Sequence, residues 1–564
     1  MRPVIYCSVI LFALCALLLG SCAVRKAPGG GPADKTPPEV VHTFPKADST
    51  DITALPYLEI EFQENLDRAS LRNQVWLLPE VPGGIELQWK GGKKLRCLLQ
   101  DSLDQDQTYI LTLGTGIKDL RGNKLAAPFV LPFSTGPVID RGEISGRVVG
   151  EKVEDVFIYA YPLDSLSSDT LLRQKPRYYT QVEKGGEFRI QYLKPARYRV
   201  FALKDENGDR RYSFQTDLIG VPFTDVALQS ESPLFRNLNF SLTREDTNSA
   251  GLVRAVPAHR RMLEVILSEP LQLEQSARIA ILDSAQNAPL EVLGSEIDPA
   301  DPAIVRVYTA PQNETVYTGQ IRGLRDVAGN PLPEAGLPFR FRGKTREDTT
   351  RFRLSRVKPS ARQKNVRYDA ALQFEFSQPA DTLSLRRGIR LLNADSLEVP
   401  GSWELYSLTV PRFIPDSLLH KGSQYLIRID SAAVRSVFGT ALGDTSGTAY
   451  YPFDTWLWED LGEIAGMVRT AKTGWDQALL EAVAFTGSKE SFQTVVRTNS
   501  PYQIPFLPEG TYQVTATIDI NGNQHFDRGA TVPFRYAEPF LIYSDTVKVR
   551  KRWTSDGIDF YFSP

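Results

Sequence analysis

The chain has 564 residues, more than one hydrophobic core usually serves, so we expect several domains. Hydrophobic residues make up 42% and charged residues 23% of the sequence, which is the balance of a folded protein rather than a disordered one. The 65 basic and 67 acidic residues nearly cancel to a net charge of −2, and the absence of a dense basic run argues against nucleic acid as a partner.

Residues 1–21 have the features of a secretory signal peptide. Arg2 precedes an apolar run, and the small residues Gly20 and Ser21 come before a break in that run. A permanent membrane span is the alternative interpretation. The apolar run is shorter than the ~20 residues that a spanning helix needs, so a signal peptide is favoured.

The signal peptide is followed by a cysteine in a specific context. The ending Leu19-Gly20-Ser21-Cys22 resembles the lipobox of bacterial lipoproteins. This resemblance implies that Cys22 is acylated, and several acyl chains on one residue would anchor the protein to a membrane. Ala23 follows in place of an acidic residue, which in such lipoproteins points to the outer membrane. Whether the protein faces the periplasm or the cell surface is left open, and envelope proteins or glycans are candidate partners.

A glycine- and proline-rich stretch then predicts a flexible tether over residues 22–35. Cys7 and Cys15 lie in the signal peptide, so Cys97 is the one further cysteine of the mature chain and no intramolecular disulfide is expected. Cys97 lies in the apolar run L-R-C-L-L, which predicts a buried, unreactive thiol rather than a nucleophile.

Three segments repeat one pattern of strands and turns. The stretch I-K-D-L-R-G-N-K-L at 117–125 matches L-R-D-V-A-G-N-P-L at 324–332, and both lie between a Tyr-containing strand and an L-P-F strand. A looser copy ends at Y-P-F-D-T, residues 451–455. The upstream strand L-E-I-E-F at 58–62 alternates apolar and polar residues, as a strand with one face in a core does.

These segments resemble the bacterial Ig-like domain of the SbsA (S-layer) type, which is a β-sandwich. The resemblance predicts such domains at 36–137, 246–345 and 346–458. The third is degenerate, since Arg435 and Thr440 replace the Asp and Asn of the D-x-x-G-N turn. We interpret that Asp and Asn as structural, because Asn and Gly tolerate left-handed backbone angles.

A second pattern fills the remaining segments. Residues 188–209 align without a gap on residues 502–523, at a constant offset of 314 positions. The pattern resembles the transthyretin-like, carboxypeptidase-regulatory-like β-sandwich, which has no catalytic residues of its own, and it implies such domains at 138–245 and 459–564. We therefore expect an all-β protein of tandem β-sandwich modules, in an elongated array after a lipoprotein signal peptide.

Two tryptophans, Trp456 and Trp458, stand at the last predicted junction. At a spacing of two they would share one face of a strand. Packing between neighbouring modules is one interpretation. Stacking on sugar rings is the other, and it makes both tryptophans candidate ligand-binding residues.

Two acidic loops at equivalent positions of the second pattern are candidate metal sites. Side-chain oxygens stand at alternate positions, as at the start of a calcium loop. The residues are Asp519, Asn521, Asn523 and Asp527 in one loop and Asp205, Asn207 and Asp209 in the other. The loops lack the glycine at position six and the glutamate at position twelve of an EF-hand, so calcium is one interpretation and a tight Asn-Gly turn is the other. We expect no other cofactor.

The sequence shows no catalytic pattern. The four histidines, His42, His259, His420 and His525, are far apart, and motifs such as G-x-S-x-G, H-E-x-x-H and C-x-x-C are missing. We therefore expect no catalytic residues and no enzymatic activity. An enzyme whose carboxylates converge between modules is left as a remote alternative.

These patterns together favour a non-enzymatic lipoprotein of the cell envelope that serves as an adhesion, scaffold or binding subunit. The alternative is a carbohydrate-binding accessory protein of a glycan-handling system, for which Trp456 and Trp458 are the motive.

Overall fold

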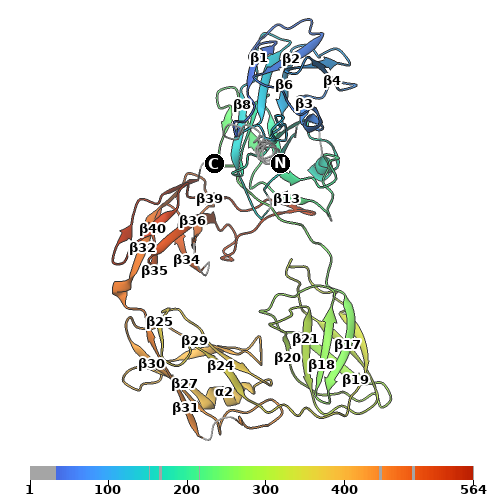
Figure 1. Ribbon diagram of the computed structural model, residues 1–564. Coiled ribbons are helices and arrows are strands. Elements are labelled where there is room, and N and C mark those ends of the chain that lie inside the picture. Colours follow the sequence, from blue (N-terminus) through green and yellow to red (C-terminus); the bar gives the residue numbers. More distant parts are fainter. Residues whose placement is uncertain are drawn as a thin grey trace, which may run out of the picture. The chain divides into compact units, whose positions relative to one another are not determined.

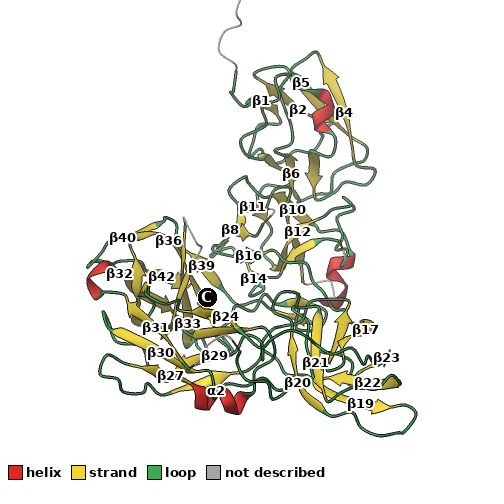
Figure 2. Ribbon diagram, turned by 60° about the horizontal axis from the view of Figure 1, so that its bottom comes forward, coloured by secondary structure: helices red, strands yellow, loops and turns green. Residues whose placement is uncertain are grey.

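The computed structural model describes residues 34–562 except 152, 164–167, 215, 444–446 and 486–489. The signal peptide, Cys22 and most of the tether lie outside the described residues. The chain divides into two compact units, one ending at Asp140 and the other beginning at Arg141. Strands dominate both units, as the sequence predicted (Figure 2). Within the described ranges, no helix is long and apolar enough to cross a membrane.

The first unit is a β-sandwich, which we call module 1 (Figure 1). One sheet has the strand order β1-β2-β5-β4 and the other has the order β3-β6-β7. Their bounds are β1 (Val40–Phe44), β2 (Tyr57–Phe62), β3 (Val75–Leu78), β4 (Ile85–Lys90), β5 (Lys94–Leu99), β6 (Thr108–Leu113) and β7 (Phe129–Ser134), with a 3-10 turn η1 (Arg68–Leu71). The predicted alternation of β2 is confirmed, because Leu58, Ile60 and Phe62 are buried in the core between the sheets.

The second unit contains two sandwiches with the same topology, modules 3 and 4. Module 3 has sheets β17-β18-β21-β20 and β19-β22-β23, and module 4 has sheets β24-β26-β29-β28 and β25-β31-β30-β27. The strand order is that of module 1, with β25 as an addition, so the repeated sequence pattern corresponds to a repeated fold. The bounds are β17 (Leu252–His259), β18 (Met262–Leu267), β19 (Arg278–Asp283), β20 (Val292–Ile297), β21 (Ile304–Thr309), β22 (Val316–Arg322), β23 (Leu337–Arg342), β24 (Leu354–Lys358), β25 (Gln363–Val366), β26 (Leu372–Phe376), α2 (Thr382–Gly388), β27 (Ile389–Leu392), β28 (Gly401–Glu404), β29 (Arg412–Pro415), β30 (Gln424–Asp430) and β31 (Thr448–Thr455).

The other two sandwiches of this unit, modules 2 and 5, share a different topology. Module 2 has sheets β11-β8-β15 and β10-β9-β12-β13, with β16 on β8 and β14 on β12. Module 5 has sheets β35-β32-β41 and β34-β33-β36-β39, with β42 on β32 and β40 on β36. A two-stranded hairpin, β37-β38, is added to module 5.

The strands of modules 2 and 5 follow the two aligned sequence repeats. In module 2 the bounds are β8 (Gly142–Val149), β9 (Phe157–Pro162), η2 (Ser168–Arg173), β10 (Tyr178–Gln181), β11 (Glu187–Leu193), β12 (Arg197–Lys204), β13 (Leu218–Gly220), β14 (Val226–Ala227), β15 (Leu234–Phe235) and β16 (Phe240–Ser241). In module 5, preceded by η3 (Trp458–Asp460), they are β32 (Leu461–Thr470), β33 (Gln477–Ala484), β34 (Ser491–Arg497), β35 (Ser500–Pro508), β36 (Gly510–Ile518), β37 (Ala530–Thr531), β38 (Phe534–Arg535), β39 (Phe540–Ile542), β40 (Val547–Val549), β41 (Thr554–Ser555) and β42 (Phe560–Phe562).

The single cysteine of the described chain lies in the core of module 1. Cys97 on β5 forms no disulfide and is 0% exposed. Burial raises the pKa of its thiol to about 12. The predicted burial of this thiol is confirmed, and its low reactivity stays a prediction.

We expect Cys97 to resist alkylation until module 1 unfolds, because the thiolate is the reactive form and burial suppresses it. The test uses the mature chain carrying Cys22→Ser, in which Cys97 is the only cysteine left. A chromogenic thiol assay should detect no thiol in buffer and one per chain in guanidinium chloride. Reaction in buffer at the rate of a small free thiol would contradict the burial.

Candidate metal centres

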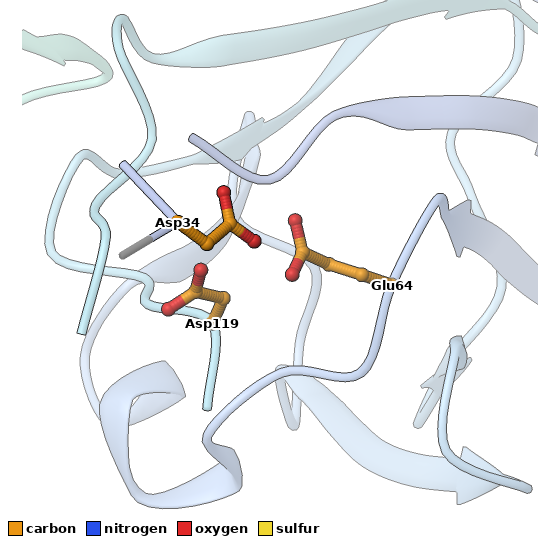
Figure 3. Close-up of side chains that lie close together, drawn as sticks. All are labelled: Asp34, Glu64 and Asp119. Atoms are coloured by element: carbon orange, nitrogen blue, oxygen red, sulfur yellow. The ribbon is translucent and has the colours of Figure 1, made fainter. Parts of the chain in front are cut away.

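Three carboxylates meet at one end of module 1 and point toward one another (Figure 3). Asp34 lies before β1, Glu64 follows β2, and Asp119 belongs to the D-x-x-G-N turn after β6. One ligand atom from each residue lies within 4.8 Å of the others. Asp119 is only 1% exposed, so the floor of this cluster is buried.

The turn sequence holds Asp119 in place. Its Oδ1 accepts hydrogen bonds from the backbone N–H groups of Arg121 at 2.7 Å and Asn123 at 2.8 Å. Its Oδ2 accepts from the Asn123 side chain at 2.7 Å, and the same amide donates to the backbone oxygen of Asp34 at 3.1 Å. Burial raises the pKa of Asp119, but these hydrogen bonds outweigh it and lower the pKa below its usual value. The turn thus holds the Asp119 carboxylate in place, and Asn123 hydrogen-bonds the backbone of the segment that carries Asp34.

Module 3 has the same cluster, formed by Asp246, Glu269 and Asp326, again with ligand atoms within 4.8 Å of one another. Asp326 accepts from the backbone N–H of Asn330 at 2.8 Å and from its side chain at 3.0 Å. The Asn330 side chain also donates to the backbone oxygen of Asp246 at 3.0 Å. Glu269 Oε2 is buried and makes no hydrogen bond with the described residues. We call the two clusters the acidic triads.

The glutamate of each triad lies in an unfavourable electrostatic environment. Burial, followed by the charges of Asp119 and Asp34, raises the pKa of Glu64. Burial, followed by the charges of Asp246 and Asp326, raises the pKa of Glu269. Ionising the third carboxyl is therefore costly without a cation, and a bound divalent cation would remove that cost.

Module 4 keeps the geometry of the triad but changes its chemistry. Ser436 bridges to Ala380 as Asp119 bridges to Leu66 in module 1. The expectation that Arg435 replaces the turn aspartate is therefore wrong by one position, since Arg435 bridges to Ala441 as Lys118 bridges to Lys124. Gln378 stands two residues before Ala380, at the place of the triad glutamate, and its amide donates to Asp348 Oδ2 at 3.0 Å. A neutral amide and a hydroxyl thus replace two of the three carboxylates. In module 4 a hydrogen bond from Gln378 therefore stands where modules 1 and 3 have a third carboxylate, although Gln378 Oε1 itself is buried and accepts no hydrogen bond from the described residues.

The triads offer the ligands that hard cations prefer, since Ca²⁺ binds carboxylate and carbonyl oxygens, six to eight at a time. The sequence pattern predicted a structural role for the turn aspartate and did not predict the triads. Their other members come from loops that only the fold brings together. A signal was nevertheless present, because Glu64 and Glu269 both stand two residues before an apolar residue that pairs with the turn.

The acidic loop of module 5 is a hydrogen-bonded turn. Asp519, which is 3% exposed, accepts from the backbone N–H groups of residues 522–524 at 2.7, 3.2 and 2.9 Å. Asp527 accepts from the side-chain amides of Asn521 and Asn523. The four predicted residues do lie together, but the loop's own N–H groups already occupy the oxygens of Asp519.

The loop of module 2 has the same arrangement. Asp205 accepts from the backbone N–H groups of Gly208 at 2.8 Å and Arg210 at 2.7 Å. Asn207 Oδ1 accepts from the N–H of Asp209 at 2.8 Å. Calcium at either loop stays a prediction, while the geometry is that of a capped turn.

Each loop also closes on a buried carboxylate that sequence analysis missed. In module 2, Asp217 accepts from the backbone N–H groups of Glu206 at 3.2 Å and Ser213 at 2.7 Å. In module 5, Glu538 accepts from the N–H of Ile520 at 2.7 Å. These carboxylates lie outside the aligned repeat, so its pattern did not include them.

The expectation that the two tryptophans share one face of a strand is wrong. The strand β31 ends at Thr455, before either tryptophan, and the chain turns into η3. Trp456 lines a cavity of about 200 Å³ between modules 4 and 5, together with Phe492 and Phe506. Trp458 is 53% exposed, and the Lys421 ammonium lies 4.6 Å from the centroid of its ring. Trp456 thus packs at the junction, and only Trp458 offers its ring to solvent.

Comparison with known families agrees with the Ig-like interpretation. The family described as "Bacterial Ig-like domain" matches residues 34–135 and 348–455, which form modules 1 and 4. The match includes the segment that the sequence pattern marked as degenerate. No curated protein matches the chain.

Several solved structures are similar to parts of this chain. Domains 1–6 of the surface layer protein SbsC are 8% identical over 86% of this chain and 66% of that one, with a TM-score of 0.15. The Bacillus anthracis TIE protein is 11% identical over 95% and 76%, with a TM-score of 0.12. An L,D-transpeptidase from Mycobacterium tuberculosis H37Rv is 13% identical over 26% and 50%, with a TM-score of 0.14. The chain spans about half the length of the first solved structures that it matches. At such TM-scores, the assignment of the fold depends on the sheet topology.

We expect Asp519→Ala to destabilise module 5 by about 1–3 kcal/mol, because three N–H groups lose their acceptor. The measurement is calorimetric unfolding of the mature Cys22→Ser chain, once in EDTA and once in calcium. An equal loss in both conditions identifies a turn cap, whereas a loss confined to calcium would make this loop a cation site. Asp545→Ala, at an exposed aspartate of the same module, is the matched control and should leave unfolding unchanged.

Proposed function

We propose that this protein is a non-enzymatic lipoprotein of the cell envelope, anchored at Cys22, whose sandwich modules serve as a scaffold or adhesion subunit. The observation that carries the proposal is the repetition of two sheet topologies over five sandwiches, two of which match a bacterial Ig-like family. Arrays of small modules present surfaces and span distance, while active sites favour deep pockets in larger domains.

The proposal also covers the kind of sandwich in modules 2 and 5, a class of partner and a location. The shared topology of modules 2 and 5 supports their resemblance to the transthyretin-like sandwich. The exposed ring of Trp458 supports glycans as a class of partner, since an aromatic face open to solvent can stack on a sugar ring. The outer membrane is the proposed location, on the basis of the lipobox-like ending alone.

We expect Cys22 to carry the anchor. Cells that make the full precursor and grow in radioactive palmitate should label the wild-type chain and also the Cys97→Ser variant, which keeps the proposed anchor. Cys22→Ser should lose the label and leave the membrane fraction. Label that survives Cys22→Ser, or no label on the wild type, would contradict the anchor.

The two acidic triads support a further part of the proposed function, namely that each binds calcium. Asp34 and Asp246 lie in the segments that lead into β1 and β17. A cation shared with Glu64 or Glu269 would therefore clamp the incoming segment onto its sandwich. In a scaffold, such clamps would stiffen the module entrances without performing chemistry.

We expect the mature Cys22→Ser chain to bind two calcium ions per chain in isothermal titration calorimetry. Glu64→Gln and Glu269→Gln should each remove one, because each takes away a charged ligand. At calcium concentrations about 100-fold above Kd, binding should stabilise the occupied module by about 2.7 kcal/mol. Asp348→Asn in module 4 is the matched control and should leave the stoichiometry unchanged.

The same sites should respond to pH. The pKa of Glu269 is raised in the folded state, so the native protein without calcium binds this proton more tightly than the unfolded chain does. Stability in EDTA should therefore fall as the pH rises through the folded pKa of Glu269, and calcium affinity should rise over the same range.

Unchanged stoichiometry in both glutamate variants, or no binding by the wild type, would contradict the triad sites.

A further inference from the structure

Modules 2 and 5 contact each other although modules 3 and 4 lie between them in the chain. The hairpin β37-β38 of module 5 lies against β12 of module 2. The ring centroid of Phe534 in this hairpin is 6.3 Å from that of Phe201, with the rings at 82°. Just beyond the hairpin, Tyr536 accepts a hydrogen bond from Arg199 Nη2 at 3.0 Å through its hydroxyl oxygen.

The gap-free alignment of the two modules shows that this contact is specified by sequence. Along β12 and β36, the core-facing pairs Tyr198/Tyr512, Val200/Val514 and Ala202/Ala516 are identical. The residues between them point to the outer face, since side chains alternate along a strand. The aligned pairs differ there, since Arg199 aligns with Gln513, Phe201 with Thr515 and Leu203 with Thr517. Module 2 thus has an apolar and cationic outer face where module 5 has a polar one.

Arg199 is the centre of the contact. It is 7% exposed and forms a two-pronged ion pair with Asp225, at 2.7 Å from Nε to Oδ1 and 2.9 Å from Nη2 to Oδ2. Its guanidinium carbon lies 4.0 Å from the centroid of the Phe534 ring and 5.4 Å from that of Tyr536. The ion pair with Asp225 and the two aromatic rings of module 5 thus enclose the buried guanidinium, whose Nη1 makes no hydrogen bond with the described residues.

Polar contacts surround this centre. Glu245 of module 2 accepts from the backbone N–H of Thr531 at 2.6 Å and also from its hydroxyl. The side chain of Asn239 donates to the backbone oxygen of Phe540 at 2.9 Å. The backbone N–H of Ala537 donates to the oxygen of Pro222 at 3.0 Å.

A second apolar contact lies beside the first. Phe223 of module 2 packs against the core of module 5, and its ring centroid is 6.1 Å from that of the buried Trp475. Module 2 therefore contributes a side chain to the core of module 5, while module 5 covers the outer face of module 2.

We infer that the outer face of β12, centred on Arg199 and Phe201, is an interaction surface whose partner is the hairpin 530–535 of the same chain. Modules 2 and 5 consequently form one stability unit across the intervening residues 246–458. The contact explains why module 2 has an apolar outer face at the positions where module 5 has a polar one.

The test exchanges the outer face of module 2 for that of module 5. Arg199→Gln with Phe201→Thr introduces the residues that the same strand carries in module 5, where the sandwich forms with them. In the mature Cys22→Ser chain, trypsin should then cut after Arg528 and Arg535, on either side of the hairpin, at least about tenfold faster than in the parent. Gln513→Ala, at the equivalent outer position of module 5, is the matched control and should leave these rates unchanged.

A variant on the other side of the contact keeps the test independent of any loss of stability in module 2. Phe534→Ser should raise the same two cleavage rates, and combining it with the exchange should raise them no further, since both remove one interface. Unchanged rates in either variant, or fully additive effects, would overturn the inference. A parent chain that elutes as a dimer, and that Phe534→Ser converts to a monomer, would assign the hairpin to a second copy and overturn the intrachain contact.

Discussion

The alternation of side chains along a β-strand is the constraint on which the whole structure depends. Each sandwich must bury the inner faces of two sheets, and this requirement fixes every second residue of each strand. Three core-facing pairs of β12 and β36 are identical, as this requirement favours. The outer faces are under no such requirement and can vary. Arg199 and Phe201 occur where another module lies against the sheet, and Gln513 and Thr515 occur at the equivalent positions of β36.

Strand ends and turns impose a second condition, because their polar groups must find partners. A carboxylate in a turn can satisfy backbone N–H groups or can face other carboxylates, and the two situations differ chemically. Asp519 accepts from three N–H groups, so its charge is already compensated within the loop. Asp119 also caps its turn, but it faces Asp34 and Glu64 as well, and burial together with these charges raises the pKa of Glu64. The second arrangement is the one for which we propose a cation.

The sequence was informative wherever the signal was local. Period-two alternation predicted strands and the burial of Leu58, Ile60 and Phe62 on β2, and the apolar run L-R-C-L-L predicted the burial of Cys97. Internal repetition predicted modules that share a topology. The triads escaped because their members come from three separate segments, and local patterns do not report which loops meet.

The contact between modules 2 and 5 escaped for a different reason. The aligned repeats contained the difference between Arg199 and Gln513, but alignment draws attention to what is shared rather than to what diverges. The prediction for Trp456 and Trp458 was wrong because it assumed local regularity that the structure does not have. The expectation of a continuous strand was carried past Thr455, where the backbone turns into η3.

The junction between modules 3 and 4 shows how a buried carboxylate is accommodated without a cation. Glu296 is 2% exposed and accepts from Ser407 at 2.7 Å, from the N–H and hydroxyl of Thr409 at 2.9 Å each, and from the Tyr308 hydroxyl at 2.5 Å. Several donors converge on one charge, which is what burial of an anion requires. Module 4 follows the same logic at its own cluster, where Gln378 donates to Asp348. Modules 1 and 3 instead bring three carboxylates together, and in module 3 the buried Glu269 Oε2 accepts no hydrogen bond from the described residues. The proposed cation of module 3 would take the place of the donors that Glu296 has and Glu269 Oε2 lacks.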